Sequence, residues 1–328
     1  GRNFFERGTP AQGHIDLPRA REARFAGGFF AIFAPSQRQS NDLGAHRSAD
    51  GYDFPMPPDL DPNQALRVTL DMAAMMFRIE RESAGEVKVT RTVDDIEQAM
   101  ASNVIAAVLH IEGADAIDTD LNALEVLYQA GLRSLGFVWS RNNAFAHGVP
   151  LRFPATPDLG PGLTDAGKAL VRACNQLGIM IDLSHITEAG FWDVAAITDA
   201  PLVATHSNVH ALCAHARNLT DKQLDAIKET GGMVGLNFGV GFLREDGAWN
   251  TDTPLSTMVR HIDYLVERVG IEHVGFGSDL DGAKIPDAFG DVTGFPKLVA
   301  ALRAAGYDDD SLEKLCHRNW LNLLRRTL

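Results

Sequence analysis

The feature that most constrains the fold is a repeated order of apolar segment, polar loop and amphipathic helix along the whole chain. Seven apolar runs have the length and composition of buried parallel strands. They span residues 25–33, 104–111, 134–139, 179–184, 202–206, 233–238 and 274–278. Because strands that alternate with helices form parallel βαβ units, this order predicts an α/β fold.

Helical periodicity is found between and around these runs. The predicted helices span residues 64–82, 92–102, 164–177, 220–230 and 253–269. Thr92 is followed by acids in the first turn, and Thr164 and Thr220 are each followed directly by Asp, a pattern typical of a capped helix start. The segment 87–90 (VKVT) alternates between apolar and polar residues, which predicts a short edge strand.

Seven strands, each followed by a helix or a long loop, predict a (β/α)8 TIM-type barrel. No linker rich in Pro, Gly or Ser divides the chain, so we expect a single domain over residues 1–328. An open doubly wound sheet is the alternative, and it requires a Gly-rich phosphate loop after its first strand. The glycines Gly27 and Gly28 lie inside an apolar run without GxGxxG spacing, so nucleotide binding has no support.

Composition excludes several classes of protein. Among 328 residues, 43 acidic side chains outnumber 30 basic ones, and a net charge of −13 argues against general binding of nucleic acid. No apolar run reaches the ~18 residues of a membrane span. The first residues, GRNFFERGTPAQGH, lack the apolar core of a signal peptide, so we expect a cytoplasmic protein. Cys174, Cys213 and Cys316 are too scattered for a disulfide framework and are expected to be small buried side chains.

Three polar residues stand at the carboxyl ends of predicted strands, at the end of a barrel where catalytic residues collect. Glu112 closes the run VIAAVLHI, and a carboxylate there needs a cation or metal partner unless its role is structural. His185 and His206 follow two consecutive strands, which lie ~5 Å apart as neighbours, so both rings could reach one metal ion. A single strand-end histidine also fits a structural role, but the combination favours a catalytic metal site.

Two further residues are candidates for chemistry. Asp279 ends the run HVGFGSD, where it could serve as the acid or base of a metal hydrolase or, alternatively, as a loop or cap residue. Arg217 lies in the loop after residues 202–206 and could bind a carboxylate, although a surface position is the alternative. His210 and His215 share that loop and are expected at its rim.

An ordered set of segments resembles the membrane dipeptidase (renal dipeptidase) family of zinc metallopeptidases, in a bacterial-type form. The segments are LPRAREARFAGGFFAIFAP, IEGADAI, GLRSLGFVWSRNN, GLTDAGKALVRACNQLGIMIDLSHI, ATHSN, ARNLTD and HVGFGSDLDG. The resemblance implies a (β/α)8 barrel with two zinc ions, a dipeptide substrate, and a homodimer as a common assembly. It implies that Glu112 bridges both ions and that His185 and His206 hold the second one. It further implies that Asp279 handles the proton of the attacking water and that Arg217 binds the substrate carboxylate.

The sequence departs from the family pattern at two places. The family ends its first strand with a His-x-Asp pair that ligates the first zinc, but His14 and Asp16 follow a polar segment and stand too close to the strand at 25–33 for a crossover of at least ~10–12 residues. We therefore expect that His14 and Asp16 are not ligands and that the first strand lies ahead of Gly1. Trp139 stands where the family has a substrate-contacting histidine, and His147 in the following loop could replace it.

The sequence thus predicts a zinc-dependent dipeptidase that attacks the peptide bond with a hydroxide bridging the metals. Asp279 would take the proton and pass it to the leaving amine. One alternative is a related barrel amidohydrolase that acts on N-acyl amino acids or lactams, which the substitution at Trp139 leaves open. The other is a non-catalytic barrel that binds a small ligand, which metal analysis would distinguish from the enzyme.

Overall fold

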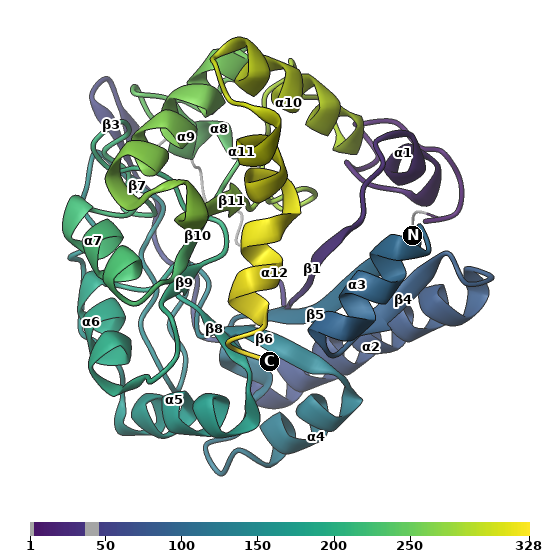
Figure 1. Ribbon diagram of the computed structural model, residues 1–328. Coiled ribbons are helices and arrows are strands. Elements are labelled where there is room, and N and C mark those ends of the chain that lie inside the picture. Colours follow the sequence, from purple (N-terminus) through teal and green to yellow (C-terminus); the bar gives the residue numbers. More distant parts are fainter. Residues whose placement is uncertain (1–2, 37–45) are drawn as a thin grey trace. The chain divides into compact units, whose positions relative to one another are not determined.

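The computed structural model describes residues 3–36 and 46–328 and divides into two compact units. The central unit comprises Ala26–Val203 with Leu324–Leu328, and the terminal unit comprises Gly1–Phe25 with Ala204–Leu323. Figure 1 shows that arrows and coiled ribbons alternate along the chain, as the sequence predicts for an α/β fold. A single domain over residues 1–328 stays a prediction.

The strands of the central unit pair in parallel around β5. They are β1 (Gly27–Phe33), β4 (Val87–Thr90), β5 (Ile105–Glu112), β6 (Leu132–Gly136) and β8 (Met180–Asp182), and β9 (Val203–Ala204) begins at the last residue of the unit. β1 runs along the whole of one edge of β5, whereas β4 covers the first half of the other edge and β6 the second half. The register places Phe33 and Gly136 on either side of Glu112. The sheet therefore presents Glu112 at the carboxyl end of its strands.

The helices of the central unit include two that begin at caps the sequence predicts, Thr92 and Thr164, and two that were not predicted, over residues 122–130 and 188–197. In chain order, the helices are α2 (Pro62–Glu82), α3 (Val93–Ala101), the 3-10 turn η2 (Ala114–Ala116), α4 (Asn122–Ala130), α5 (Asp165–Leu177) and α6 (Glu188–Ile197). Thr92 and Asp95 form a reciprocal capping box, and the Thr164 hydroxyl accepts from the Gly167 N–H at 3.0 Å. A small antiparallel sheet of β2 (Arg47–Ser48), β3 (Gly51–Asp53) and β7 (Arg152–Phe153) was not predicted, because strands of two or three residues have no readable period.

The terminal unit has the same alternation on a smaller scale. Its elements are α1 (Leu17–Glu22), α7 (Asp221–Glu229), β10 (Met233–Leu236), α8 (Val240–Leu243), α9 (Leu255–Val269), η3 (Ile271–His273), β11 (Val274–Phe276), η4 (Val292–Gly294), α10 (Phe295–Ala304), α11 (Asp309–Glu313), the π-helical η5 (Lys314–Arg318) and α12 (Asn319–Leu324). β10 pairs in parallel with β11. Thr220 caps α7 in a capping box with Gln223, as the Thr-Asp pattern predicts.

The predicted α/β class is confirmed, and each of the seven predicted strands overlaps an observed parallel strand. The observed strands are mostly shorter, since the chain turns away before the polar residue that follows the apolar run. The segment 87–90 is the short edge strand β4. Cys174 and Cys213 are buried as predicted, but the prediction is wrong for Cys316, which is exposed on η5. Among the described residues, every helix is too short or too polar to cross a bilayer.

A buried histidine in α9 should make the stability of the protein depend on pH. His261 is fully buried, with Nε2 2.9 Å from the Leu243 carbonyl oxygen and Nδ1 accepting from the Val209 N–H at 3.3 Å. Burial lowers the pKa of His261 to about 4. An unfolded histidine has a pKa near 6.5, so between pH 6.5 and about 4 the unfolded chain binds a proton that the folded chain does not bind. The free energy of unfolding should therefore fall as the pH drops from about 6.5 to about 4.

Urea unfolding of the wild type and of His261→Gln at pH 7 and pH 5 tests this expectation. Glutamine keeps a neutral donor for the Leu243 carbonyl but removes the titration. We expect the wild type to lose about 2 kcal/mol more than the variant between these two pH values, since each pKa unit corresponds to about 1.4 kcal/mol. An equal loss in both proteins would contradict the assignment.

Candidate functional site

Glu112 and His185 meet at the carboxyl ends of β5 and β8. The distance from His185 Nε2 to Glu112 Oε1 is 2.9 Å, and the exposed fractions of the two side chains are 6% and 16%. Every other residue of β5 is buried, so the strand runs through the interior and ends with the Glu112 carboxylate at a partly exposed edge. The sequence predicts that these two residues act together, and within the central unit the structure places them in contact.

The second ring nitrogen of His185, Nδ1, makes a hydrogen bond with a side chain of the central unit. Nδ1 lies 3.1 Å from the Ser140 hydroxyl, and the His185 carbonyl accepts from the Val149 N–H at 2.8 Å. His185 has a left-handed backbone conformation (φ 71°), which turns its ring back toward Glu112 after β8. A histidine that ligates a metal through one nitrogen commonly has its other nitrogen fixed in this way. Sequence reasoning missed Ser140, although it closes the predicted strand 134–139.

A second polar pair lies deeper in the same sheet and was also missed. His110 Nδ1 is 2.8 Å from the Ser134 hydroxyl, and its Nε2 is 3.8 Å from Asp182 Oδ2. The other oxygen of Asp182 accepts from the Ser184 N–H at 3.0 Å, which shapes the turn that leads to His185. His110 was not predicted as a site residue, because it lies within an apolar run. We infer that His110 and Asp182 hold the turn that leads to His185, since both side chains are almost fully buried.

Aromatic side chains flank the Glu112–His185 pair. The Trp139 ring lies 5.2 Å from the Phe33 ring and 6.0 Å from the His185 ring, centroid to centroid. The Arg141 guanidinium stands 5.9 Å from the Trp139 ring centre. His147, the alternative that the sequence left open, has its Nδ1 3.1 Å from the Gly162 carbonyl oxygen instead. Of the two candidates, Trp139 is therefore the one whose ring contacts His185.

In the terminal unit, a hydrogen bond links Arg217 to His206. The Arg217 Nη2 donates to the His206 carbonyl at 3.0 Å, and the guanidinium stands 5.5 Å from the centre of the Phe242 ring. His206 Nδ1 lies 2.8 Å from the Thr205 hydroxyl. Arg217 is 4% exposed, which rules out the surface position. His215, expected at the rim, is fully buried, because its Nδ1 accepts from the Arg217 N–H and its ring packs on Phe242.

Asp279 is tied to the same group of residues through Asn237, which sequence reasoning missed. The Asn237 Nδ2 donates to Asp279 Oδ2 at 2.9 Å and to the His206 carbonyl at 3.3 Å. Its Oδ1 accepts from the Gly239 N–H, which fixes the orientation of the amide. Asp279 itself has φ +60°. Asn237 follows β10 directly, so the rule that selected the other strand-end residues applies to it as well.

His14 and Asp16 lie in the loop before α1 rather than at the end of a strand. Asp16 caps α1, and its two oxygens accept from the N–H groups of Gly8 and Arg19 and from the Arg19 guanidinium. His14 contacts Asp281. Both side chains thus have partners in the protein, and the expectation that they are not metal ligands stays a prediction.

Comparison with known proteins gives a consistent result. The profile of a family described as Membrane dipeptidase (Peptidase family M19) matches residues 3–327. A metallo peptidase from Rhodobacter sphaeroides, solved with a phosphinate mimic of the dipeptide L-Ala-D-Ala, is 50% identical with a TM-score of 0.94, over 96% of this chain and 91% of that one. A structure of dipeptidase AC is 51% identical with a TM-score of 0.93, over 96% and 90%.

A curated relative extends the similarity at the level of sequence. An uncharacterized protein in the pqqA 5′ region of Klebsiella pneumoniae is 48% identical over 264 residues, which are 80% of this chain and 97% of that protein. The two solved structures share the fold of this chain over nearly its full length. That shared fold is the one that the resemblance in the sequence implies.

Proposed function

The chain belongs to the membrane dipeptidase family, peptidase family M19, and from that premise we propose that it hydrolyses dipeptides at a zinc centre held by Glu112, His185 and His206. The family and the dipeptidase structures make it a metallo-dipeptidase rather than a non-catalytic barrel. Zinc as the metal, two ions per complete chain, and the roles of individual residues are our proposals. A homodimer and a cytoplasmic location stay predictions.

The observation that carries the proposal is the 2.9 Å contact between Glu112 and His185, because a carboxylate and an imidazole are ordinary zinc ligands. Nδ1 of His185 is directed at Ser140 and Nε2 at Glu112, so the nitrogen that faces the carboxylate is the one that would bind the metal beside it. The register supports His206 as the third ligand. Asp182 of β8 pairs with Val203 of β9, and His185 and His206 each follow by three residues. Neighbouring strands ~4.8 Å apart bring equivalent positions within reach of one ion.

The remaining residues suggest how the peptide bond is broken. Zinc, when bound, makes water a nucleophile near neutral pH and polarises the substrate carbonyl. We infer that Asp279 accepts a proton as the water oxygen attacks the carbonyl carbon, and that it delivers a proton to the nitrogen as the C–N bond breaks. Asn237 holds the carboxylate of Asp279 for this task. Arg217, which is buried and donates to the His206 carbonyl, would bind the free carboxylate of a short peptide.

A substrate panel tests this function against its nearest alternative. The zinc-loaded protein should hydrolyse L-Ala-L-Ala and L-Ala-D-Ala, the latter chosen because its phosphinate mimic is bound by the relative from R. sphaeroides. N-acetyl-alanine and a lactam serve as the competing classes. A kcat/KM at least ~100-fold higher for the dipeptides is expected. Preference for the acylated or cyclic amides would instead support a related amidohydrolase. That enzyme is the second candidate, because Trp139 stands where the family has a substrate-contacting histidine.

Replacing Arg217 should weaken the binding of substrates that carry a free carboxylate. Arg217→Lys retains one positive charge but loses the planar pair of donors. Because hydrogen bonds between charged groups contribute about 1.5–3 kcal/mol, the KM for L-Ala-L-Ala should rise roughly 10- to 100-fold. The C-terminal amide of the same dipeptide, which lacks the charge, should respond much less. An equal effect on both substrates would mean that Arg217 does not bind the carboxylate.

A further inference from the structure

The segment from Gly8 to Arg19 contacts the loop that joins β11 to η4 at Asp281, and it also contacts Val292, the first residue of η4. The His14 N–H donates to Asp281 Oδ1, and the Asp281 N–H donates back to His14 Nδ1 at 2.9 Å. The His14 carbonyl accepts from the Val292 N–H at 2.9 Å. One residue of the segment therefore ties together positions 281 and 292. The reciprocal bond also assigns the ring proton of His14 to Nε2, since Nδ1 is an acceptor.

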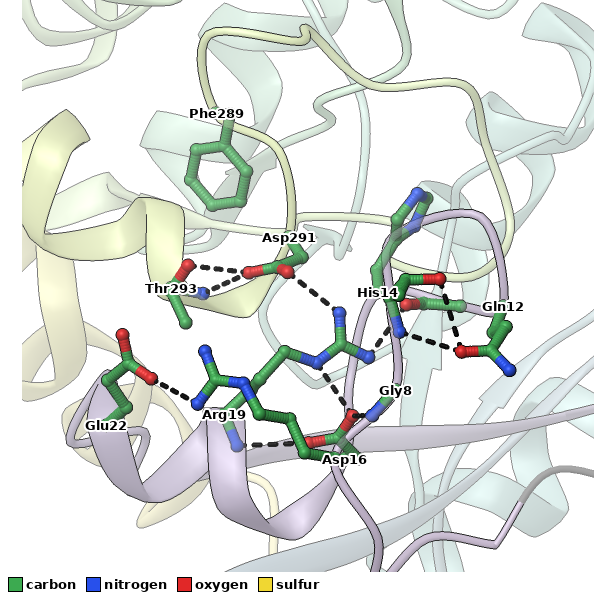
Figure 2. A network of polar contacts seen from close by, with 12 residues as sticks. Gly8, Gln12, His14, Asp16, Arg19, Glu22, Phe289, Asp291 and Thr293 are labelled. Atoms are coloured by element: carbon green, nitrogen blue, oxygen red, sulfur yellow. Dashed lines mark hydrogen bonds and ion pairs between the residues drawn. The ribbon is translucent and has the colours of Figure 1, made fainter.

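A buried ion cluster fixes the segment in place. The Arg19 guanidinium donates to Asp16 at 2.7 Å, to Asp291 at 2.7 Å and to the Gly13 carbonyl at 2.8 Å. Figure 2 shows Arg19 between the two carboxylates. Burial opposes ionisation of both carboxyls, but these hydrogen bonds outweigh it and hold the pKa values of Asp16 and Asp291 below their ordinary range. The cluster is thus ionised at neutral pH and forms a rigid base for His14.

The loop that is held in this way carries Asp279. Asp279 and Asp281 both have left-handed backbones, with φ +60° and +67°, a conformation that residues other than glycine adopt infrequently. Gly282 packs so closely that an added Cβ would lie 2.1 Å from Asp279 Oδ1. Such a turn persists only if its surroundings hold it. Asn237 holds the carboxylate from the β10 side, and His14 holds the backbone from the other side.

We propose that His14 is a positioning residue for Asp279, acting through Asp281. This inference rests on the proposed role of Asp279 as the group that accepts and delivers the proton. His14 keeps the turn from 279 to 281 in its strained form, so that the carboxylate stays where the reacting water needs it. A displacement of 1 Å at a reacting group can cost ~100-fold in rate. The His-x-Asp pair of residues 14 and 16 therefore serves the proton-transfer residue and not the metal.

The test compares His14→Ala with His14→Asn, because the asparagine Oδ1 can replace Nδ1 as the acceptor for the Asp281 N–H. For His14→Ala we expect kcat to fall roughly 10- to 100-fold, with KM within about threefold and bound zinc unchanged. Amide hydrogen exchange in peptides covering 279–292 should rise. His14→Asn should restore most of kcat and of the protection. Arg7→Ala is the matched control, since both side chains of the Arg7–Glu22 ion pair are more than half exposed.

A double-mutant cycle guards against variants that merely unfold the segment. His14→Ala removes the acceptor for the Asp281 N–H, and Asp281→Ala removes the acceptor for the His14 N–H. Because both hydrogen bonds hold one turn, the losses of kcat in the double variant should be coupled rather than additive. Additive losses, or unchanged exchange and kcat in His14→Ala, would overturn the proposal. So would loss of zinc from both His14 variants, which would make His14 a ligand. A wild type that does not cleave dipeptides would refute the proposed function, whereas hydrogen exchange would still decide the role of His14.

Discussion

Glu112→Gln should abolish dipeptide hydrolysis, with a loss of at least ~10³-fold in kcat/KM and a matching loss of bound zinc. Glutamine has nearly the shape of glutamate but lacks the negative charge that would neutralise the metal. The carboxylate stands 2.9 Å from His185 Nε2 at the end of a buried strand. Because we propose that Glu112 binds both ions, its loss should empty the whole centre. Activity at several zinc concentrations and metal analysis after dialysis measure the effect.

Glu125→Gln provides the matched control for this substitution. Glu125 lies exposed on α4 of the same unit, so the change in charge is the same but is remote from β5 and β8. We expect wild-type activity and zinc content for this variant. Full activity of a metal-free Glu112→Gln protein would exclude the proposed chemistry.

Asp279→Asn should separate proton transfer from metal binding. An amide cannot accept the proton of the attacking water, and general acid–base catalysis by one group commonly contributes 10²–10⁴-fold. We therefore expect kcat to fall by roughly that factor, with zinc content unchanged and KM within a few fold. Asp287→Asn is the control, since Asp287 is exposed on the same loop and accepts from the Thr251 hydroxyl, which asparagine can also do. Wild-type kcat for Asp279→Asn would assign the proton to another group.

The order of the elements was predictable from the sequence because burial imposes a simple pattern on it. Parallel strands buried on both faces read as continuous apolar runs, and every predicted run contains a strand. Helix starts at Thr92, Thr164 and Thr220 were predictable from local capping chemistry, which does not depend on the rest of the fold. α6 was missed, because EAGFWDVAAI has no clear polar face. The sheet of β2, β3 and β7 depends on pairing between distant residues, which local patterns do not reveal.

The candidate site was predictable where a polar residue ends an apolar run. Glu112, His185, His206 and Asp279 satisfy that rule, and the structure adds the contact of Glu112 with His185. Residues that support them were harder to find, since Ser140 and Asn237 have common side chains that gain meaning only from their partners. The link between His14 and Asp281 spans 267 positions, so it could not be inferred from spacing. The ligand and catalytic roles themselves stay predictions.

Diffraction at the zinc absorption edge from crystals of the zinc-loaded protein tests the central claim most directly. The account predicts an anomalous peak bounded by a carboxylate oxygen of Glu112 and by ring nitrogens of His185 and His206, at about 2.0–2.2 Å from each. A peak held by other residues, or one to which Glu112 and the two histidines contribute nothing, would contradict the account.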